Sequence, residues 1–432
     1  MDFQQACEAV LARQHIKKSP SFSAILKCLE RLGNPHRGLR AVHVAGTNGK
    51  GSVCALTAAA LTASGAKTGM FTSPHLLDIR ERIMVDGEMI SRAEFAQAVA
   101  NTLAAEPGVP EKLTFFEILT CAAFLHFKRR GVDAAVMETG IGGRLDVTNI
   151  LENPALCIIT SISLDHVQML GDTVEKIAFE KAGIMKKGVP CVCGPLPSTA
   201  ETVMAARAGE CGAPLTLLRK SDAFAPVETD WEHGRSEIKS PQGKTYTLAL
   251  LGETQSVNAA IVSQAVEILN TRGFAITDAH LRRAFATVNW PARFQVLHSG
   301  GTTWILDGGH NEEAAAGFAR AFSASPFSLK RPIFIIGVMA DKDYRAILRE
   351  LAPLLNRVIA TKPASPRALD PMALADAVAE AAPDADIQVE SSLENAICAA
   401  QEAGTAVIIG SFYLAGAAIP LLKSNAITAG KC

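Results

Sequence analysis

Over most of the chain, short apolar runs alternate with longer stretches in which apolar residues recur at helical spacing. Mostly apolar runs predict buried strands, because parallel strands covered on both faces lose their polar alternation. They span residues 39–44, 67–71, 132–137, 156–162, 189–193 and 214–218. Helical periodicity separates them, over residues 53–64, 113–130 and 173–185. This succession predicts α/β architecture, with a doubly wound, mostly parallel sheet in the first domain.

The pattern changes in the second half of the chain. Alternating polar and apolar residues at 229–251, with a Pro-Gln-Gly turn at 241–243, predict a small antiparallel excursion. Strand–helix alternation then restarts at Val296 and predicts a second, Rossmann-like α/β domain without a G-x-G-x-x-G dinucleotide motif. Because 432 residues are too many for one core, we expect domains at 1–295 and 296–432.

The first strand leads into a glycine-rich turn at Gly46–Ser52, and a helix follows. Strand, glycine-rich turn, lysine, hydroxyl and helix form the layout of a phosphate-binding loop. Lys50 would reach the β- and γ-phosphates, and the Ser52 hydroxyl would face Mg²⁺. The loop is a variant, because the first glycine of G-x-x-x-x-G-K-[ST] would fall on Val44 and Gly51 separates lysine from serine. The alternative is a glycine-rich turn without a ligand.

Three later strands end in polar residues at the same edge, provided that the sheet is parallel. These residues are Ser73, Glu138 and His166. Each alone fits a solvated turn, and a single histidine is more often structural than a ligand. Their convergence beside the phosphate-binding loop favours a metal or phosphate role. By contrast, spacing alone leaves Lys181 as a solvated helix lysine.

Composition narrows the class of partner. The balance of 42 basic against 43 acidic residues gives no general field for nucleic acid or an anionic membrane. No run of eighteen apolar residues occurs, so we expect no membrane partner. Residues 1–12 predict an amphipathic helix, not a signal peptide. Ten cysteines without a C-x-x-C motif are typical of a reducing compartment, so we expect a cytoplasmic protein.

A nucleoside triphosphate site has two broad uses. One is phosphoryl transfer to a substrate oxygen, including that of a carboxylate, and the other is hydrolysis that drives a conformational switch. The switch requires an Asp-x-x-Gly after the loop and a guanine-selecting N-K-x-D. Residues 165–168 do not satisfy the first motif, and the second is absent. A ligase or kinase is therefore favoured over a switch or binding module.

The motifs together resemble the Mur ligase superfamily and, within it, the folylpolyglutamate synthase/dihydrofolate synthase family. They run in family order along most of the chain, and the early position of the loop favours the folate branch. The carrying segments are Gly46–Ser52, Ser73–Leu76, Glu138–Asp146, Ser163–His166, Glu180–Ile184, Arg293–Gln295, Asp307–Asn311, Asp341–Asp343 and Gly410–Ser411. An alternative is another short Mur-type carboxylate–amine ligase with a non-folate acceptor.

The resemblance implies an ATP-dependent acid–amino-acid ligase of folate and one-carbon metabolism, acting as a monomer. The γ-phosphoryl would pass from ATP to a carboxylate, and an amine would attack the acyl phosphate. The acceptor would be a folate or dihydropteroate, and L-glutamate would supply the amine. Magnesium is implied at two sites, and a monovalent cation is a further candidate.

The resemblance also implies roles for individual residues. Thr47, Asn48, Gly49, Lys50, Gly51, Ser52, Asn258, Arg293 and Asp307 would bind ATP. Ser52, Ser73, Glu138, His166 and a carbamylated Lys181 would hold the metals. Thr114, Phe115, Phe116, Glu117, Leu145, Asp146 and Val147 would contact the pterin substrate, with a loop at 18–22 closing over it. Lys50, Lys181, His310 and Ser411 would take part in catalysis.

Two positions depart from the family pattern. Thr254-Gln255 stands where the family often has His-Gln, which puts an adenine contact at residue 254 in doubt. Glu312 replaces the proline that commonly follows Asp-Gly-Ala-His-Asn and would start the next helix.

Overall fold

The computed structural model describes residues 1–14 and 21–423. Residues 18–20 of the closing loop predicted at 18–22 lie outside these residues. The described chain divides into two compact units. Unit 1 contains residues 1–224 and 257–288, and unit 2 contains residues 225–256 and those from 289 onward. The boundary predicted between residues 295 and 296 stays a prediction.

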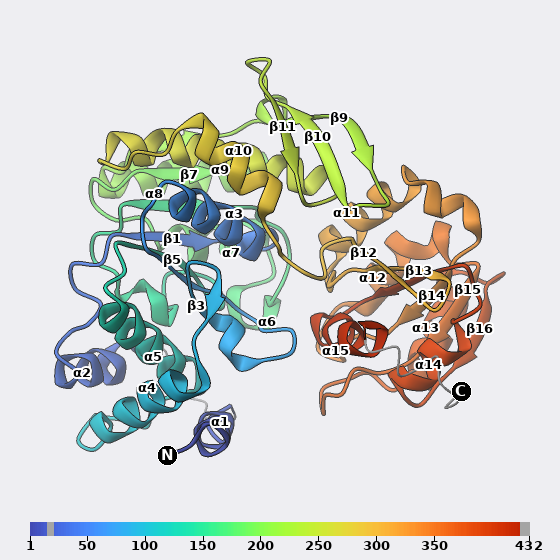
Figure 1. The fold of residues 1–432 in the computed structure, drawn as a ribbon, viewed down its shortest axis with the longest axis horizontal. Coiled ribbons are helices and arrows are strands. Elements are labelled where there is room, and N and C mark those ends of the chain that lie inside the picture. The colour runs from blue at the N-terminus through green and yellow to red at the C-terminus, as the bar shows by residue number, and fades with distance from the viewer. Residues whose placement is uncertain (15–20, 424–432) are drawn as a thin grey trace. The chain divides into compact units, whose positions relative to one another are not determined.

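Unit 1 is built on an eight-stranded sheet with the order β4-β3-β2-β5-β1-β6-β7-β8. Figure 1 labels β1, β3, β5 and β7 of this sheet. The strands are β1 (Ala41–Ala45), β2 (Thr68–Phe71), β3 (Ile83–Val85), β4 (Glu88–Met89), β5 (Ala134–Glu138), β6 (Leu156–Ile159), β7 (Cys191–Cys193) and β8 (Leu215–Leu217). Strands β2, β5, β1, β6, β7 and β8 are parallel, as the apolar runs predicted. The antiparallel strands β3 and β4 were not predicted, because they are too short to show a period.

Helices cover both faces of this sheet. They are α1 (Phe3–Leu11), α2 (Ser23–Arg31), α3 (Lys50–Ala63), α4 (Arg92–Ala105), α5 (Phe115–Arg130), α6 (Val167–Leu170), α7 (Val174–Ala182), α8 (Ser198–Cys211), α9 (Glu253–Thr271, in this unit from residue 257) and α10 (Asp278–Thr287). Short 3₁₀ helices span Ile79–Arg82, Val147–Ile150 and Lys220–Asp222. One core joins α1, α2, α4 and α5 to the strands, and another joins α7 and α8. Helix α3 packs on β1, β2 and β5, with α10 beside it.

Unit 2 holds two sheets. The small one is antiparallel, with strands β9 (Ala225–Asp230), β10 (Arg235–Lys239) and β11 (Thr245–Leu248). It confirms the antiparallel excursion that the sequence predicted, although its residues belong to unit 2 and we expected them within the first domain. The large one has the order β12-β13-β17-β14-β15-β16. Its strands are β12 (Gln295–Ser299), β13 (Thr302–Leu306), β14 (Ile333–Ile336), β15 (Arg357–Ala360), β16 (Asp386–Val389) and β17 (Thr405–Ile409). All but β12 run parallel, which confirms the second α/β domain.

Helices complete the core of unit 2. They are α11 (Glu312–Ser323), α12 (Tyr344–Leu351), α13 (Pro371–Ala381), α14 (Leu393–Ala399) and α15 (Phe412–Lys423), with 3₁₀ turns at Pro326–Lys330 and Ala352–Leu354. Helices α11, α12 and α13 share one apolar core with β14, β15 and β17. Helix α15 packs against β12, β17 and α14. No helix among the described residues is long and apolar enough to cross a membrane.

Candidate active site

The predicted phosphate-binding loop leaves β1 at the centre of the unit 1 sheet and opens α3. Two glycines are required by its shape. Gly49 caps α3 in the left-handed conformation, with φ +83°, and a Cβ there would come within 2.7 Å of Asn258 Oδ1. A Cβ at Gly46, where φ is +153°, would overlap the hydroxyl of Thr160. The loop therefore lies tightly between the end of β6 and helix α9, with the predicted nucleotide residue Asn258 beside it.

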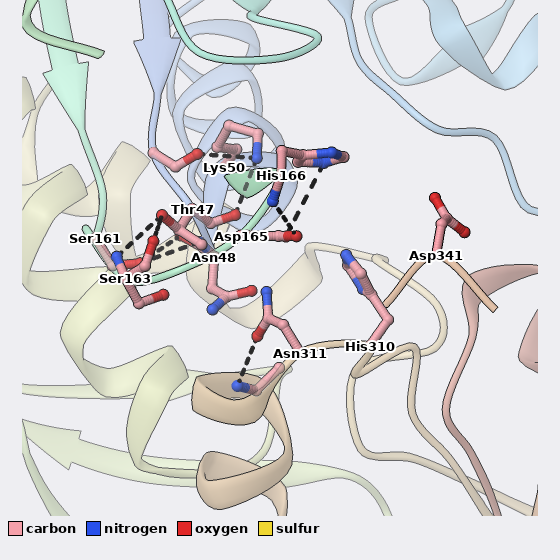
Figure 2. A network of polar contacts seen from close by, with 12 residues as sticks. Thr47, Asn48, Lys50, Ser161, Ser163, Asp165, His166, His310, Asn311 and Asp341 are labelled. Carbon is pink, nitrogen blue, oxygen red and sulfur yellow. Dashed lines mark hydrogen bonds and ion pairs between the residues drawn. The ribbon is translucent and has the colours of Figure 1, made fainter. Parts of the chain in front are cut away.

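Residues that follow β6 hold the loop in place (Figure 2). The Thr47 N–H donates to Ser161 O at 2.8 Å, and the Asn48 N–H donates to Ser161 Oγ at 3.0 Å. The Thr47 hydroxyl donates to Ser163 O and accepts from the Ser163 N–H, each at 3.1 Å. Sequence reasoning named Ser163 only as part of a motif and missed Thr160 and Ser161. Their polarity directly after a buried strand was the available signal.

Two lysines meet at one carbonyl of this loop. Lys50 Nζ donates to Gly46 O and Thr47 O, each at 3.0 Å, and Lys181 Nζ donates to Gly46 O at 2.7 Å. Lys181 is only 4% exposed near the end of α7, so it is not the solvated helix lysine that spacing alone suggested. The structure thus places Lys181 at the loop.

The oxygen ligands predicted for magnesium lie on the edge where the parallel strands end. Val44 of β1 is in register with Glu138, the last residue of β5. The buried Glu138 carboxylate accepts the Ser73 N–H at 3.0 Å. The buried Ser52 hydroxyl has no hydrogen-bond partner among the described residues, as expected of an oxygen kept for a cation or phosphate.

His166 does not follow the strand as directly as the sequence indicated. The predicted strand over 156–162 ends at Ile159, because the next residues turn to bind the loop. His166 is the N-cap residue of the short helix α6, with φ +51°, and its ring lies 4.0 Å from the Asp165 carboxylate (Figure 2). Among the described residues, no group of three or more His, Cys, Asp or Glu side chains could hold a metal.

Buried carboxylates bind backbone N–H groups in the segments that are predicted to contact the substrate. Glu117 forms a capping box with Thr114 at the start of α5. Asp146 Oδ2 accepts the N–H groups of Gly140 and Ile141 at 2.8 and 3.0 Å, while its Oδ1 accepts from Thr148. Burial raises the pKa of Asp146 above its usual range, although these hydrogen bonds oppose the shift.

The other residues that are predicted to contact the substrate differ in how exposed their side chains are. Phe115 and Phe116 are partly buried, and Leu145 is 41% exposed. Val147 is partly buried and begins a 3₁₀ turn. The side chains that remain accessible for contact are thus mainly apolar or aromatic.

A histidine–arginine pair near this region was missed by sequence reasoning. Arg82, which is 6% exposed, donates from Nε to His75 Nδ1 at 2.8 Å, and its guanidinium lies 5.2 Å from the Phe115 ring centroid. Burial, helped by the charge of Arg82, lowers the pKa of His75 to about 4. The pair joins the Ser73–Leu76 segment to the start of α5.

In unit 2, the predicted residues gather where β13 and β17 end. Asp307 Oδ2 accepts the Phe294 N–H at 2.8 Å, and Oδ1 accepts the Gly309 N–H at 2.7 Å. Burial raises the pKa of Asp307, against the charge of Arg293. His310 Nδ1 lies 3.0 Å from Gly308 O, and the buried Ser411 Oγ accepts the Tyr413 N–H at 3.1 Å. The structure thus brings Arg293, Asp307, His310 and Ser411 to one end of this sheet.

Comparison with known proteins identifies two family domains and several relatives of this chain. The Mur ligase middle domain matches residues 44–266, and the Mur ligase glutamate ligase domain matches residues 292–412. Folylpolyglutamate synthase of Lacticaseibacillus casei is 33% identical over 96% of this chain and 98% of its own length. Dihydrofolate synthase/folylpolyglutamate synthase of Bacillus subtilis is 34% identical over 82% and 84%.

A solved structure agrees with these relatives over the whole fold. Mycobacterium tuberculosis folylpolyglutamate synthase complexed with ADP superposes with a TM-score of 0.89 and 31% identity, covering 98% of both chains. Family domains, full-length relatives and fold therefore agree, and the chain belongs to the folylpolyglutamate synthase/dihydrofolate synthase family of the Mur ligase superfamily.

Proposed function

We propose that this protein is an ATP-dependent ligase that joins L-glutamate to folates and to dihydropteroate. The observation that carries the proposal is the loop at Gly46–Ser52, with two lysines on one carbonyl and Glu138 at the same sheet edge. This arrangement suits a triphosphate with a divalent cation, and the relatives named above are ligases of this kind. Unit 2 contains its own polar group around Asp307.

The chemistry needs an activated acceptor, because a carboxylate is a poor electrophile. A carboxylate oxygen of the acceptor would attack the γ-phosphorus of ATP, and the bond to the ADP oxygen would break. The glutamate amine would then attack the resulting acyl phosphate, and inorganic phosphate would leave as the amide forms. The protein's contribution is mainly positioning and neutralisation of charge on the transferred group.

Individual side chains fit parts of this reaction. Lys50 would bind the phosphates once they displace its hydrogen bonds to the loop carbonyls. His310 would donate its Nδ1 proton to Gly308 O, so that Nε2 is the nitrogen able to take a proton from the attacking amine. Asn258, Arg293 and Asp307 would hold the nucleotide.

Magnesium fits the residues present. Ser52, Ser73 and Glu138 would hold one ion, and His166 with a carbamylated Lys181 would hold another. When bound, Mg²⁺ supplies positive charge that stabilises the transferring phosphoryl group. Carbamylation would replace one of two neighbouring ammonium groups by an oxygen ligand, which a hard cation prefers. A monovalent cation, a monomeric state and a cytoplasmic location stay predictions.

The test of this function is a coupled measurement of nucleotide and amide products. Purified protein with MgATP should release ADP and phosphate only when a pteroate-type acceptor and L-glutamate are both present. Mass spectrometry should show the acceptor heavier by one glutamyl residue. Product release that ignores either substrate would contradict the proposal.

The acceptor is identified by a parallel comparison. Dihydropteroate and a reduced folate should be assayed side by side with the same enzyme preparation, and we expect both to be extended. Extension of one alone would restrict the enzyme to that reaction. A panel of unrelated carboxylic acids that worked equally well would instead favour a non-folate Mur-type ligase.

A further inference from the structure

Phe412 lies among the polar residues of unit 2 and contacts two of them, Arg293 and His310. It is the first residue of α15 and directly follows the buried Ser411. Its ring is half-buried. The Arg293 guanidinium carbon lies 4.3 Å from its ring centroid, and the His310 ring centroid lies 5.0 Å away, tilted by 58°. One aromatic ring thus contacts two side chains that the reaction needs.

The backbone around the ring is shaped to admit it. A Cβ at Gly308 would overlap the edge of the Phe412 ring. The carbonyl of Gly308 is also the hydrogen-bond partner of His310 Nδ1, at 3.0 Å. The same glycine therefore seats both the phenyl ring and the imidazole, and a side chain there would move them together.

Both the backbone and the guanidinium group of Arg293 are restrained. Its neighbours Ala292 and Phe294 have φ values of +55° and +45°, which residues with a side chain rarely adopt. Asp307 holds this segment by accepting the Phe294 N–H, and the Arg293 guanidinium donates to Ala292 O at 2.9 Å. The face of Phe412 then attracts the guanidinium electrostatically. Asp307 thus restrains the backbone at Arg293, while Phe412 restrains the head group.

We propose that Phe412 is a positioning residue that orients Arg293 for the nucleotide and His310 for amide formation. The inference rests on the proposed ligase function and adds a residue to it. Because one ring contacts both groups, the orientations of the guanidinium and the imidazole are coupled. Loss of the aromatic face should impair nucleotide binding and turnover together, although Phe412 need not touch a reacting atom.

Phe412→Leu removes the aromatic face and keeps an apolar side chain, whereas Phe412→Tyr keeps the face. We expect the leucine variant to raise KM for ATP and lower kcat, each by roughly threefold to thirtyfold. The tyrosine variant should stay within about twofold of the parent protein. Gly308→Ala should resemble Phe412→Leu, because the added methyl group displaces the ring.

Phe327→Leu is the matched control. Phe327 is a buried phenylalanine of the same unit, and Lys330 Nζ lies 5.8 Å from its ring centroid. We expect this variant to lower thermal stability without changing KM for ATP or kcat. If Phe412→Leu changes only the folded fraction, as this control does, Phe412 is a structural core residue and the proposal is overturned.

A second readout does not depend on ligase activity. The ring current of Phe412 should shift the NMR signals of the His310 ring, because the two ring centroids lie 5.0 Å apart. These signals are assigned by their loss in His310→Gln. In Phe412→Leu these signals should move, while in Phe412→Tyr and Phe327→Leu they should stay close to their original positions. Unmoved signals would overturn the proposal. Failure of the parent protein to ligate glutamate would overturn only the proposed function.

Discussion

At the scale of single residues, the carbonyl oxygen of Gly46 is the atom at which two positively charged side chains meet. It accepts from Lys50 at 3.0 Å and from Lys181 at 2.7 Å, so two ammonium groups share one partner. Like charges this close repel, and burial of Lys181 reduces the screening by water. Carbamylation of Lys181 would reverse the sign of one of these two charges.

We therefore expect Lys181→Ala to lose nearly all ligation. Formate or acetate should restore part of the activity, because a small carboxylate can replace the carbamate oxygens in the space left by the side chain. Initial rates of ADP release that depends on acceptor and glutamate measure the effect. Lys176→Ala on the same helix is the control, since Lys176 pairs only with Asp172 at the surface among the described contacts. Full activity of Lys181→Ala would refute a metal-bridging role.

A second feature at this scale is a buried chain of hydrogen bonds that joins Asp146, Thr148 and His43. The Thr148 hydroxyl donates to Asp146 Oδ1 at 2.6 Å, so it accepts from His43 Nε2 at 2.8 Å. His43 is fully buried in β1, and its Nδ1 has no hydrogen-bond partner among the described residues. Burial lowers the pKa of His43 to about 3, with a smaller effect from the charge of Lys186.

This shift predicts acid sensitivity. Because the folded-state pKa lies below the ordinary value near 6.5, the unfolded chain binds the proton first. Stability from neutral His43 is complete above about pH 6.5 and falls by roughly 1.4 kcal/mol per pH unit toward pH 3. Urea unfolding at pH 7 and pH 5 should show a smaller acid loss in His43→Gln than in the parent protein. Equal losses would exclude His43 as the cause.

At the scale of elements, the connection between β1 and α3 determines where phosphate can bind. The loop leaves the central strand, whose neighbours β5 and β6 return by separate crossovers. Such a position in an open parallel sheet is where ligands bind, at the carboxyl ends of the strands. The left-handed Gly49 then aims the first N–H groups of α3 at the loop.

Gly49→Ala should weaken nucleotide binding by at least roughly tenfold, since the methyl group meets Asn258 and the backbone is strained. Gly65→Ala is a close control, because Gly65 ends the same helix region with φ +93° and has nothing within 4 Å of an added Cβ. Both variants should lose about 1–2 kcal/mol of stability from the left-handed backbone. Calorimetry with ADP separates them, and equal affinities would contradict the argument.

At the scale of the whole molecule, each unit has its own apolar core. Phe124 lies in a core of unit 1, and Phe334 lies in the core of unit 2. The three tryptophans, Trp231, Trp290 and Trp304, all belong to unit 2. Tryptophan fluorescence therefore reports unfolding of unit 2, whereas far-ultraviolet circular dichroism reports both units.

We expect Phe124→Ala to destabilise unit 1 by about 3–5 kcal/mol and to leave the fluorescence-detected transition in place. Circular dichroism should then show an earlier first transition. Phe334→Ala is the reciprocal control and should shift the fluorescence transition. If Phe124→Ala moves both probes together, the two units unfold as one cooperative body.

Local pattern determined much of this protein. Buried parallel strands show as apolar runs, and the spacing of Gly49, Lys50 and Ser52 indicated a phosphate loop, because both signals lie within a few consecutive residues. The convergence of Ser73 and Glu138 also followed, since carboxyl ends of parallel strands share an edge. The spacing of Lys181 alone suggested a surface residue. From the sequence, only the family resemblance assigned it to the site.

Tertiary structure alone decided which residues support the loop and which side chain lies between Arg293 and His310. Thr160 and Ser161 hold the loop only because β6 lies beside β1 in the sheet order, a pairing that no local period encodes. Phe412 meets Arg293 and His310 only because β13 and β17 are neighbours. Sequence therefore determined the elements and the loop chemistry, whereas strand order determined the contacts, because these join residues more than one hundred positions apart.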